Sequence, residues 1–237
     1  MKRFWDIATA APHEDGGFTV LLDGRPMRLP GGGPMRLPSL LLAEAVAGEW
    51  QQAGSAKGGE MSMEMVPLTR MAGTAIDRVA PDPQPSVDAI AAYGETDLLC
   101  YRGDDRRLAA IQDAEWQPLL DWAADSLSAP LLVTTGIIHV AQPPESLAAL
   151  KRAVAALPPL ELTALGLAVP LLGSLVLGLA LLHGRLDAGE ATRLALVDES
   201  WQQDLWGEDE EAMARRRAVG QDVALAERLM RLAAVGA

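Results

Sequence analysis

Residues 18–30, FTVLLDGRPMRLP, decide the fold class of the N-terminal part of this chain. Two candidate strands, 18–22 and 25–29, are separated only by Asp23 and Gly24. An Asp-Gly pair supplies the positive φ angles that a two-residue type I′ turn requires, and such a turn joins antiparallel strands. We therefore predict a β-hairpin at this position.

Helical patterns follow the hairpin. Ser39 is a suitable N-cap for a helix over about 40–52, in which apolar residues recur four positions apart on one face. A glycine- and methionine-rich loop over 56–65 comes next. Pro67 is tolerated at the first position of a second helix, whose apolar stripe extends to Val79.

The rest of the chain is predicted to be mostly helical. After a proline-rich linker at 80–86, helical patterns cover residues 86–94, 107–127, 144–156, 160–182, 188–206 and 208–234. Two extended pieces, 97–101 and 131–140, either pair with each other or join the N-terminal sheet. The predicted fold class is α+β. A small, mostly-β N-terminal domain with one or two helices, residues 1–85, precedes a larger all-α C-terminal domain, residues 86–237.

The composition limits the possible partners. The chain has 32 acidic and 20 basic side chains and a formal net charge of −12, so it repels nucleic acid and anionic membrane surfaces. A basic partner protein is the better electrostatic match. The single cysteine, Cys100, permits no internal disulfide and suits a reducing compartment. The N-terminal MKRFWDIA lacks the apolar run of a signal peptide, so we expect a cytoplasmic protein.

One segment competes with the assignment to the cytoplasm. Residues 162–182, LTALGLAVPLLGSLVLGLALL, carry no charge and are long enough for a transmembrane helix. The alternative is a buried core helix, or two helices that meet at Pro170, which cannot donate a backbone hydrogen bond. Hydropathy alone leaves both possibilities open.

The sequence contains none of the common catalytic motifs. Phosphate-binding loops, dinucleotide-binding glycine patterns, nucleophile elbows and zinc-protease motifs are all absent. The three histidines, His13, His139 and His183, lie far apart, and none has a second histidine or cysteine at metal-ligand spacing. Cys100 lies in the apolar sequence DLLCY and is predicted to be a core residue.

An acidic stretch near the C-terminus has two parts. Gly207 is predicted to end a helix, and the acids at 208–211 then occupy the first turn of the next helix, where negative charge is favourable. Glu211 and Arg215 have the spacing of an ion pair within that helix. A calcium loop would need alternating oxygen ligands and a central glycine, which this stretch lacks.

The second part of the acidic stretch, Asp198 and Glu199, is predicted to lie inside the preceding helix. Glu199, Gln203 and Trp206 then share one face. A face with an acid, an amide and a tryptophan is a candidate contact surface, because aromatic side chains anchor interfaces. The alternative is a solvated face with Trp206 packed on a neighbouring helix.

Eight segments distributed over the chain carry a resemblance to a known family. They are RFW at 3–5, GGFTVLLDGRPMRLP at 16–30, LAEAVAGEWQQAG at 42–54, MVPLTRMAGTAIDRV at 65–79, ETDLLCYR at 95–102, EWQPLLDWA at 115–123, GSLVLGLAL at 173–181 and DESWQQDLWGEDEEA at 198–212. Through them the chain resembles the assembly chaperones of the F-type ATP synthase that bind its α subunit, in mitochondria and α-proteobacteria.

The resemblance implies a function and a location. It implies a soluble, non-enzymatic chaperone that needs no cofactor and holds the free α subunit until the β subunit replaces it. We expect a monomer when free, in the bacterial cytoplasm or, for eukaryotic relatives, the mitochondrial matrix, with no nucleic-acid or membrane partner. The 162–182 segment would then be a buried helix pair.

The family pattern and the shared helix face together nominate partner-binding residues. These residues are Trp50, Arg70, Asp77, Asp198, Glu199 and Trp206. Trp50 has the alternative role of a core residue, and Arg70 and Asp77 that of an ion pair between neighbouring helices. Two other functions stay open from the sequence: a carboxylate-dependent metal hydrolase that uses residues 198–211, and a membrane-anchored scaffold that uses 162–182.

Overall fold

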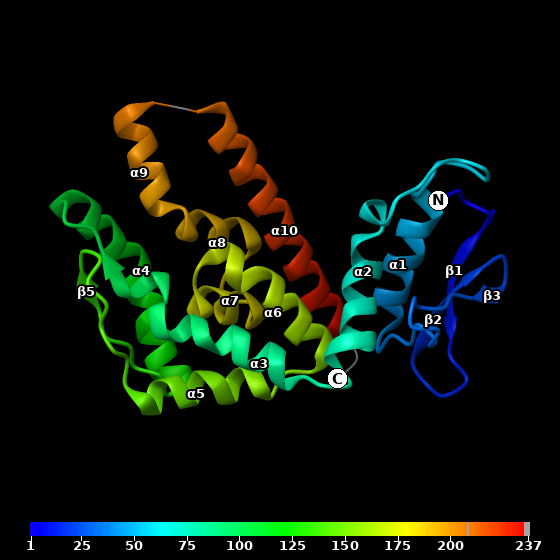
Figure 1. Cartoon of the computed structure of the whole chain (residues 1–237), viewed down its shortest axis with the longest axis horizontal. Helices are drawn as coiled ribbons and strands as arrows, with labels where there is room; N and C mark the ends of the chain where they lie inside the picture. The colour runs from blue at the N-terminus through cyan, green and yellow to red at the C-terminus, as the bar shows by residue number, and fades with distance from the viewer. Residues whose placement is uncertain (208, 235–237) are drawn as a thin grey trace. The chain divides into compact units, whose positions relative to one another are not determined.

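The computed structural model describes residues 1–207 and 209–234 (Figure 1). The chain forms two compact units. Unit 1 contains residues 1–83, residues 158–164 and the chain from residue 228 onward. Unit 2 contains residues 84–157 and 165–227.

Unit 1 contains a three-stranded antiparallel sheet with the strand order β1-β2-β3. Its strands are β1 (Ala8–Pro12), β2 (Phe18–Leu22) and β3 (Arg25–Pro26). The predicted hairpin is confirmed, because Leu22 pairs with Arg25 across a turn in which Asp23 and Gly24 have φ angles of 48° and 77°. Strand β1 lies in the part of the chain that was predicted to be mostly β, although ATAAP lacks the bulky residues typical of strands.

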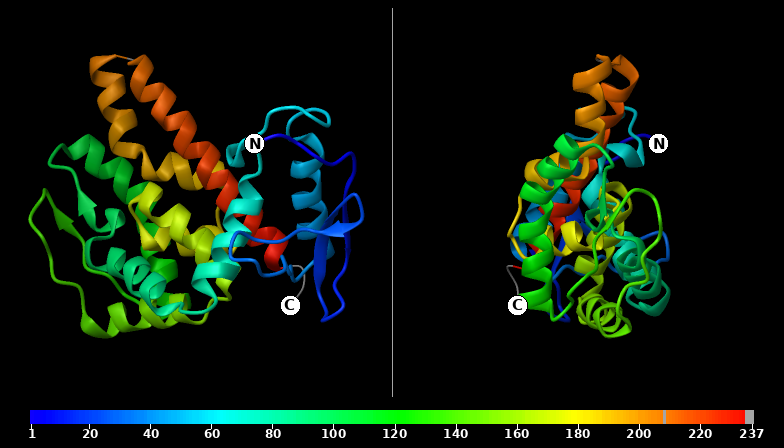
Figure 2. Two further views of the ribbon diagram at one scale, coloured as in Figure 1. Left: turned by 45° about the vertical axis from the view of Figure 1, so that its right-hand side comes forward. Right: turned by 90° about the vertical axis from the view of Figure 1, so that its left-hand side faces the viewer.

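Helices cover the sheet of unit 1. Helix α1 (Leu40–Gln52) packs on β1 and β2 (Figures 1 and 2), and the Ser39 side chain accepts the backbone N–H of Leu42, as expected of an N-cap. After a single 3₁₀ turn (Met63–Met65), helix α2 (Pro67–Thr74) begins at the predicted proline. It continues directly into a π-helical turn (Ala75–Val79), which the sequence pattern does not predict.

The core of unit 1 combines segments that are distant in the sequence. Trp5 is fully buried against Trp50, with 4.8 Å between the ring centroids. Leu229 and Met230, near the end of the last helix, are also buried. The Ser39 hydroxyl donates a 2.7 Å hydrogen bond to the carbonyl oxygen of Leu232, which ties the start of α1 to that last helix.

Unit 2 is mainly helical. Its helices, of which α6 and α10 also contribute residues to unit 1, are α3 (Gln84–Ala91), α4 (Arg106–Leu127), α5 (Pro144–Ala155), α6 (Pro159–Leu172), α7 (Leu175–Leu182), α8 (Ala188–Ala195), α9 (Val197–Trp206) and α10 (Glu210–Ala234). The 3₁₀ turns Ala92–Thr96 and Leu98–Cys100 precede strand β4 (Tyr101–Arg102). This strand pairs in parallel with β5 (Thr134–Thr135), so the two extended pieces pair with each other. The predicted α+β fold class is confirmed.

The apolar segment 162–182 belongs to two helices. The expected junction at Pro170 is wrong, because Pro170 lies within α6 and the break comes at Gly173, whose φ angle is +62°. Ser174 then caps α7, whose residues from Leu175 to Leu181 are all buried. Within residues 1–207 and 209–234, the structure contains no helix that is both long and apolar enough to cross a membrane.

The predicted helix over 188–206 is also interrupted. Helix α8 ends before Leu196, whose φ and ψ angles of −105° and 17° are not helical, and α9 begins at Val197. Asp198 and Glu199 therefore lie in the first turn of a helix and not in its interior, which corrects the sequence interpretation. In that position their negative charge is favourable to the helix.

Candidate functional site

Helix α9 carries three of the predicted contact residues, Asp198, Glu199 and Trp206, and α10 follows it in the chain (Figure 1). Trp206 at the end of α9 is 78% exposed, and Leu205 beside it is 58% exposed. Gly207, with a φ angle of +94°, ends the helix as predicted. Trp206 is therefore not packed on a neighbouring helix, and the indole is available to a partner.

A polar network joins the two helices below Trp206. The Glu199 carboxylate accepts hydrogen bonds from Arg215 at 2.9 Å and from Arg216 at 3.4 Å. Arg216 also donates to the Gln203 side chain. We call this surface the α9–α10 tip; it comprises Glu199, Gln203, Leu205, Trp206, Arg215 and Arg216. All of these residues except Leu205 line a pocket of about 360 Å³.

The network changes two expectations from the sequence. Arg215 pairs with Glu199 on the facing helix, and no described ion pair joins it to Glu211. Glu199 and Gln203 do share a face, as predicted, but that face is directed partly at α10. Helix α10 begins at Glu210 as the predicted acidic first turn, and Glu208 lies outside the described residues.

Asp198 has a different environment from Glu199. Its carboxylate accepts a hydrogen bond from the side chain of Gln112, a fully buried residue of α4. The other end of the Gln112 amide accepts the backbone N–H of Gly103 at 2.7 Å. Asp198 therefore connects the start of α9 to α4, whereas Glu199 belongs to the α9–α10 tip.

The other three predicted residues lie together in unit 1. Trp50, Arg70 and Asp77 all line one pocket of about 740 Å³. Trp50 is 6% exposed and donates a 2.8 Å hydrogen bond from its indole nitrogen to the Thr69 hydroxyl, so most of its ring belongs to the core. Asp77 accepts the backbone N–H of Gly31 at 3.2 Å.

Arg70 and Asp77 are not an ion pair of neighbouring helices. Arg70 lies on α2, and Asp77 lies on the π-helical turn that continues it. Among the described residues no ion pair joins the two side chains, and both are exposed. The sequence did not nominate Arg28 and Arg78, which line the same pocket. The only sequence signal for them is that they belong to two of the segments that carry the family resemblance, at 16–30 and 65–79.

The cysteine and the potential metal-ligating side chains form no reactive site among the described residues. Cys100 is buried, and burial raises the pKa of its thiol to about 12, so the thiol is neutral and the predicted core position is confirmed. In the part of the chain that the structure describes, no three or more His, Cys, Asp or Glu side chains are grouped so that they could hold a metal ion. The residues that stand out are those suited to contacts with another protein.

An exposed tryptophan beside a charged network, together with a pocket that is part apolar and part basic, has the composition typical of protein interfaces. The chain belongs to the ATP12 chaperone protein family, whose family model matches residues 2–124. The family predicted from the eight sequence segments is thereby confirmed, and the chain is a chaperone of that family.

Individual relatives agree with this assignment over the rest of the chain. The chain is 25% identical to protein atp12, mitochondrial, of Schizosaccharomyces pombe over 223 residues, which is 89% of this chain and 75% of the relative. It is 44% identical to Atp12 from Paracoccus denitrificans, whose crystal structure it matches with a TM-score of 0.91 over 98% of each chain. An aspartate-to-lysine variant of the Paracoccus protein matches with a TM-score of 0.92, at 43% identity, over 98% of this chain and 97% of the variant.

Proposed function

We propose that this chaperone is not an enzyme, and that it binds the free α subunit of the F-type ATP synthase through the α9–α10 tip until the β subunit takes its place. The observation that carries the proposal is the exposure of Trp206. Leaving a large indole in water forgoes the free energy of its burial, so a protein that keeps it at a helix end gains most when a partner covers it. Tryptophan and arginine are also the residues that dominate binding energy in interfaces.

A chaperone of this kind needs a surface that is partly apolar and partly polar. An unassembled subunit exposes an apolar interface that would otherwise aggregate. A chaperone has to cover this interface and also leave when the true partner arrives, which requires moderate affinity and a polar rim around an apolar centre. In the α9–α10 tip, Trp206 and Leu205 form the apolar centre, and Glu199 with its two arginines forms the polar part.

The ion pairs of the tip support exchange with a partner. Glu199 and Arg215 are both partly exposed, and such surface pairs contribute little to stability. A basic group on the client could therefore take the place of Arg215 at small cost, which agrees with the net charge of −12. Asp198 would act through its bond to Gln112 by fixing the start of α9.

The proposal also includes the remaining predictions from the sequence. Trp50, Arg70 and Asp77 would form a second contact surface in unit 1. We also propose that the free chaperone is a monomer and that it acts in the bacterial cytoplasm.

The test is a binding assay with purified free α subunit. Trp206→Ala is expected to weaken binding by about 10-fold or more, the effect of losing one anchor residue. Ile137→Ala is the matched control and should bind normally. Ile137 is an apolar residue that is 98% exposed and lies in the loop after β5. If the unchanged chain does not bind α, or if Trp206→Ala binds as well as Ile137→Ala, the proposal is wrong.

A second arm of the assay addresses the polar part of the tip. Glu199→Gln removes the negative charge and keeps the size of the side chain, so it should weaken α binding, whereas Glu211→Gln in α10 should not. Glu199→Lys is less informative by itself, because it places a third positive charge beside Arg215 and Arg216 and disturbs the helix pair. Circular dichroism of each variant checks that the fold is unchanged.

A further inference from the structure

The pocket of unit 1 that is lined by Trp50, Arg70 and Asp77 combines methionine and arginine side chains. We propose that it binds a segment of the client polypeptide in which a carboxylate side chain lies next to a large apolar side chain. We call it the methionine–arginine pocket, after the lining residues Met1, Met27, Met63, Arg28, Arg70 and Arg78. The inference rests on the proposed chaperone function and specifies the chemistry of its second contact surface.

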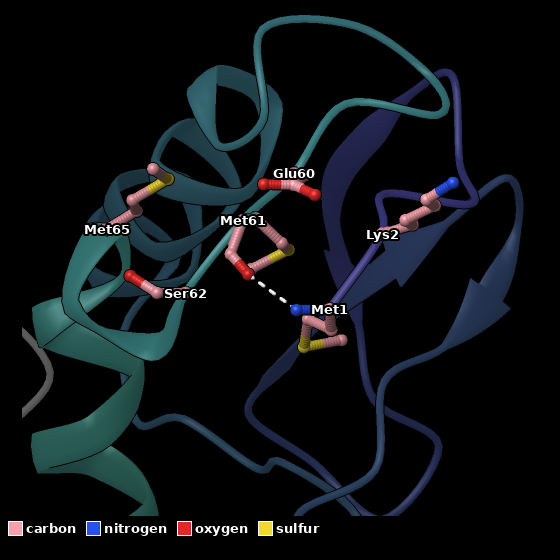
Figure 3. Close-up of a pocket in the computed structure, with 6 residues that line it drawn as sticks. All are labelled: Met1, Lys2, Glu60, Met61, Ser62 and Met65. Atoms are coloured by element: carbon pink, nitrogen blue, oxygen red, sulfur yellow. Dashed lines mark hydrogen bonds between the residues drawn. The ribbon is translucent and has the colours of Figure 1, made fainter.

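Three methionines, Met1, Met27 and Met63, line the apolar part of the pocket together with Leu29, Pro30 and Trp50. Met63 is 39% exposed, and Met1 and Met65 are more exposed still. Figure 3 shows that Met1, Met61 and Met65 surround an adjoining pocket of about 410 Å³, where the amine of Met1 donates a 2.8 Å hydrogen bond to the carbonyl oxygen of Met61. Methionine side chains are flexible and polarisable, so such a surface adapts to apolar side chains of different shapes.

The polar part of the pocket is positively charged. Arg28, Arg70 and Arg78 line it together with a single acid, Asp77, which already accepts the backbone N–H of Gly31. None of the three arginines makes an ion pair with another described residue. Three unneutralised guanidinium groups in a chain with a net charge of −12 indicate that the missing negative charge comes from the ligand.

The wall between these two parts is held in place before any ligand binds. Glu49 on α1 accepts the backbone N–H groups of Leu68 and Thr69 at 2.8 and 3.1 Å, and so fixes the start of α2. The Thr69 hydroxyl in turn accepts the indole N–H of Trp50. Because the wall is preorganised, a ligand does not have to order it, and more of the contact energy appears as affinity.

The combination favours a peptide segment over other anionic ligands. A nucleic acid offers a long row of phosphates, and the acidic chain around the pocket would repel it. A small inorganic anion would use the arginines and leave the methionine surface uncovered. An acidic side chain followed or preceded by a leucine or phenylalanine satisfies both parts at once.

The test uses the full chain with ¹³C-methyl-labelled methionine and two synthetic peptides. One peptide has the sequence acetyl-GLEFLEG-amide, and the other replaces both glutamates by glutamine. The glutamate peptide is expected to shift the methyl resonances of Met27 and Met63 but not that of Met213 in α10, and to bind about 10-fold more tightly than the glutamine peptide. Methionine-to-leucine variants assign the resonances.

Charge reversal gives the matched controls. The double variant Arg70→Glu, Arg78→Glu should lose the preference for the glutamate peptide and bind α more weakly. Arg107→Glu, at an exposed arginine of α4, should change neither. The inference is wrong if no methyl resonance of the pocket shifts at peptide concentrations up to about 1 mM, if the shifts occur elsewhere, or if both peptides bind equally well.

The two proposals fail in different ways. If the glutamate peptide shifts Met27 and Met63 but the chain does not bind α, the function proposal is wrong and the pocket assignment holds. If α binds the double variant normally and no pocket methyl shifts, the pocket assignment alone is wrong.

Discussion

Asp97 joins two separate segments of unit 2 through its buried side chain. Its carboxylate is completely buried and accepts three hydrogen bonds, from the Ser174 hydroxyl and from the backbone N–H groups of Leu99 and Val176. These bonds connect the 3₁₀ turn before β4 to the first turn of α7. Burial raises the pKa of Asp97 above its ordinary value, against the effect of the three donors.

Replacing this carboxylate should be costly. Asp97→Ala leaves three buried donors without an acceptor, so we expect the free energy of unfolding to fall by about 3 kcal/mol or more. Urea unfolding followed by circular dichroism measures the change. Asp125→Ala, at an exposed position of α4, is the control and should unfold like the unchanged chain. A loss below about 1 kcal/mol for Asp97→Ala would show that the three bonds matter little.

The raised pKa of Asp97 also predicts a direction of pH dependence. The folded chain holds the Asp97 proton more tightly than the unfolded chain, so its contribution is fully present below the unfolded pKa of about 3.9. It is lost as the pH rises through the higher folded pKa. The stability difference between the unchanged chain and Asp97→Ala should therefore grow as the pH is lowered through the raised folded pKa of Asp97. If the stability difference becomes smaller on acidification, the pKa of Asp97 is lowered by folding and not raised.

At the scale of the element, Gly173 decides how the apolar segment folds. Its φ angle of +62° lies in the left-handed region, which costs other residues about 1–2 kcal/mol. Pro170 removes one hydrogen-bond donor but leaves α6 intact, because only the positive φ angle turns the chain into the separate helix α7. The backbone conformation of one glycine thus sets the boundary that the proline was expected to set.

Gly173→Ala should therefore destabilise the chain by about 1 kcal/mol, measured as the change in the free energy of unfolding in urea. Gly48→Ala is the matched control, since Gly48 lies inside α1 with no atom near an added Cβ. This second variant should stabilise the chain by about 0.5–1 kcal/mol, because alanine is the better helix former. Equal effects of the two variants would contradict the role given to Gly173.

At the scale of the whole molecule, unit 1 depends on residues from three parts of the chain. Leu229 comes from the far end of α10, is fully buried in unit 1, and lies three residues before the carbonyl that accepts the Ser39 hydroxyl. Leu229→Ala removes buried apolar volume, so we expect it to cost about 2–5 kcal/mol. Hydrogen exchange of α1 should then accelerate, although α1 is almost two hundred residues away in the sequence.

Leu205→Ala is the control for this variant, because Leu205 is exposed in α9 and its loss leaves no cavity. Its hydrogen exchange in α1 should match that of the unchanged chain. If Leu229→Ala leaves α1 equally protected, the end of α10 does not support the N-terminal unit.

Sequence reasoning was sufficient wherever the determining residues are neighbours in the chain. Asp23 and Gly24 set the hairpin, Ser39 and Pro67 set the starts of α1 and α2, and the eight motifs established the family. It was insufficient for the bounds of β1, whose sequence has no strand pattern and which forms because β2 and α1 pack against it. It also placed Asp198 and Glu199 within one long helix, because the break at Leu196 has no glycine or proline to mark it.

By itself, the sequence determined the α+β class and the excess of negative charge, since these depend on local pattern and composition, and eight of its segments carried the resemblance to a chaperone family. Only the tertiary structure decided how the charged residues are used. Glu199 is tied to Arg215 and Arg216, whereas Arg70 and Arg78 have no ion-pair partner among the described residues. The physical reason is that a pair three or four residues apart gains little over a pair formed across two helices, so packing between distant segments decides which one forms.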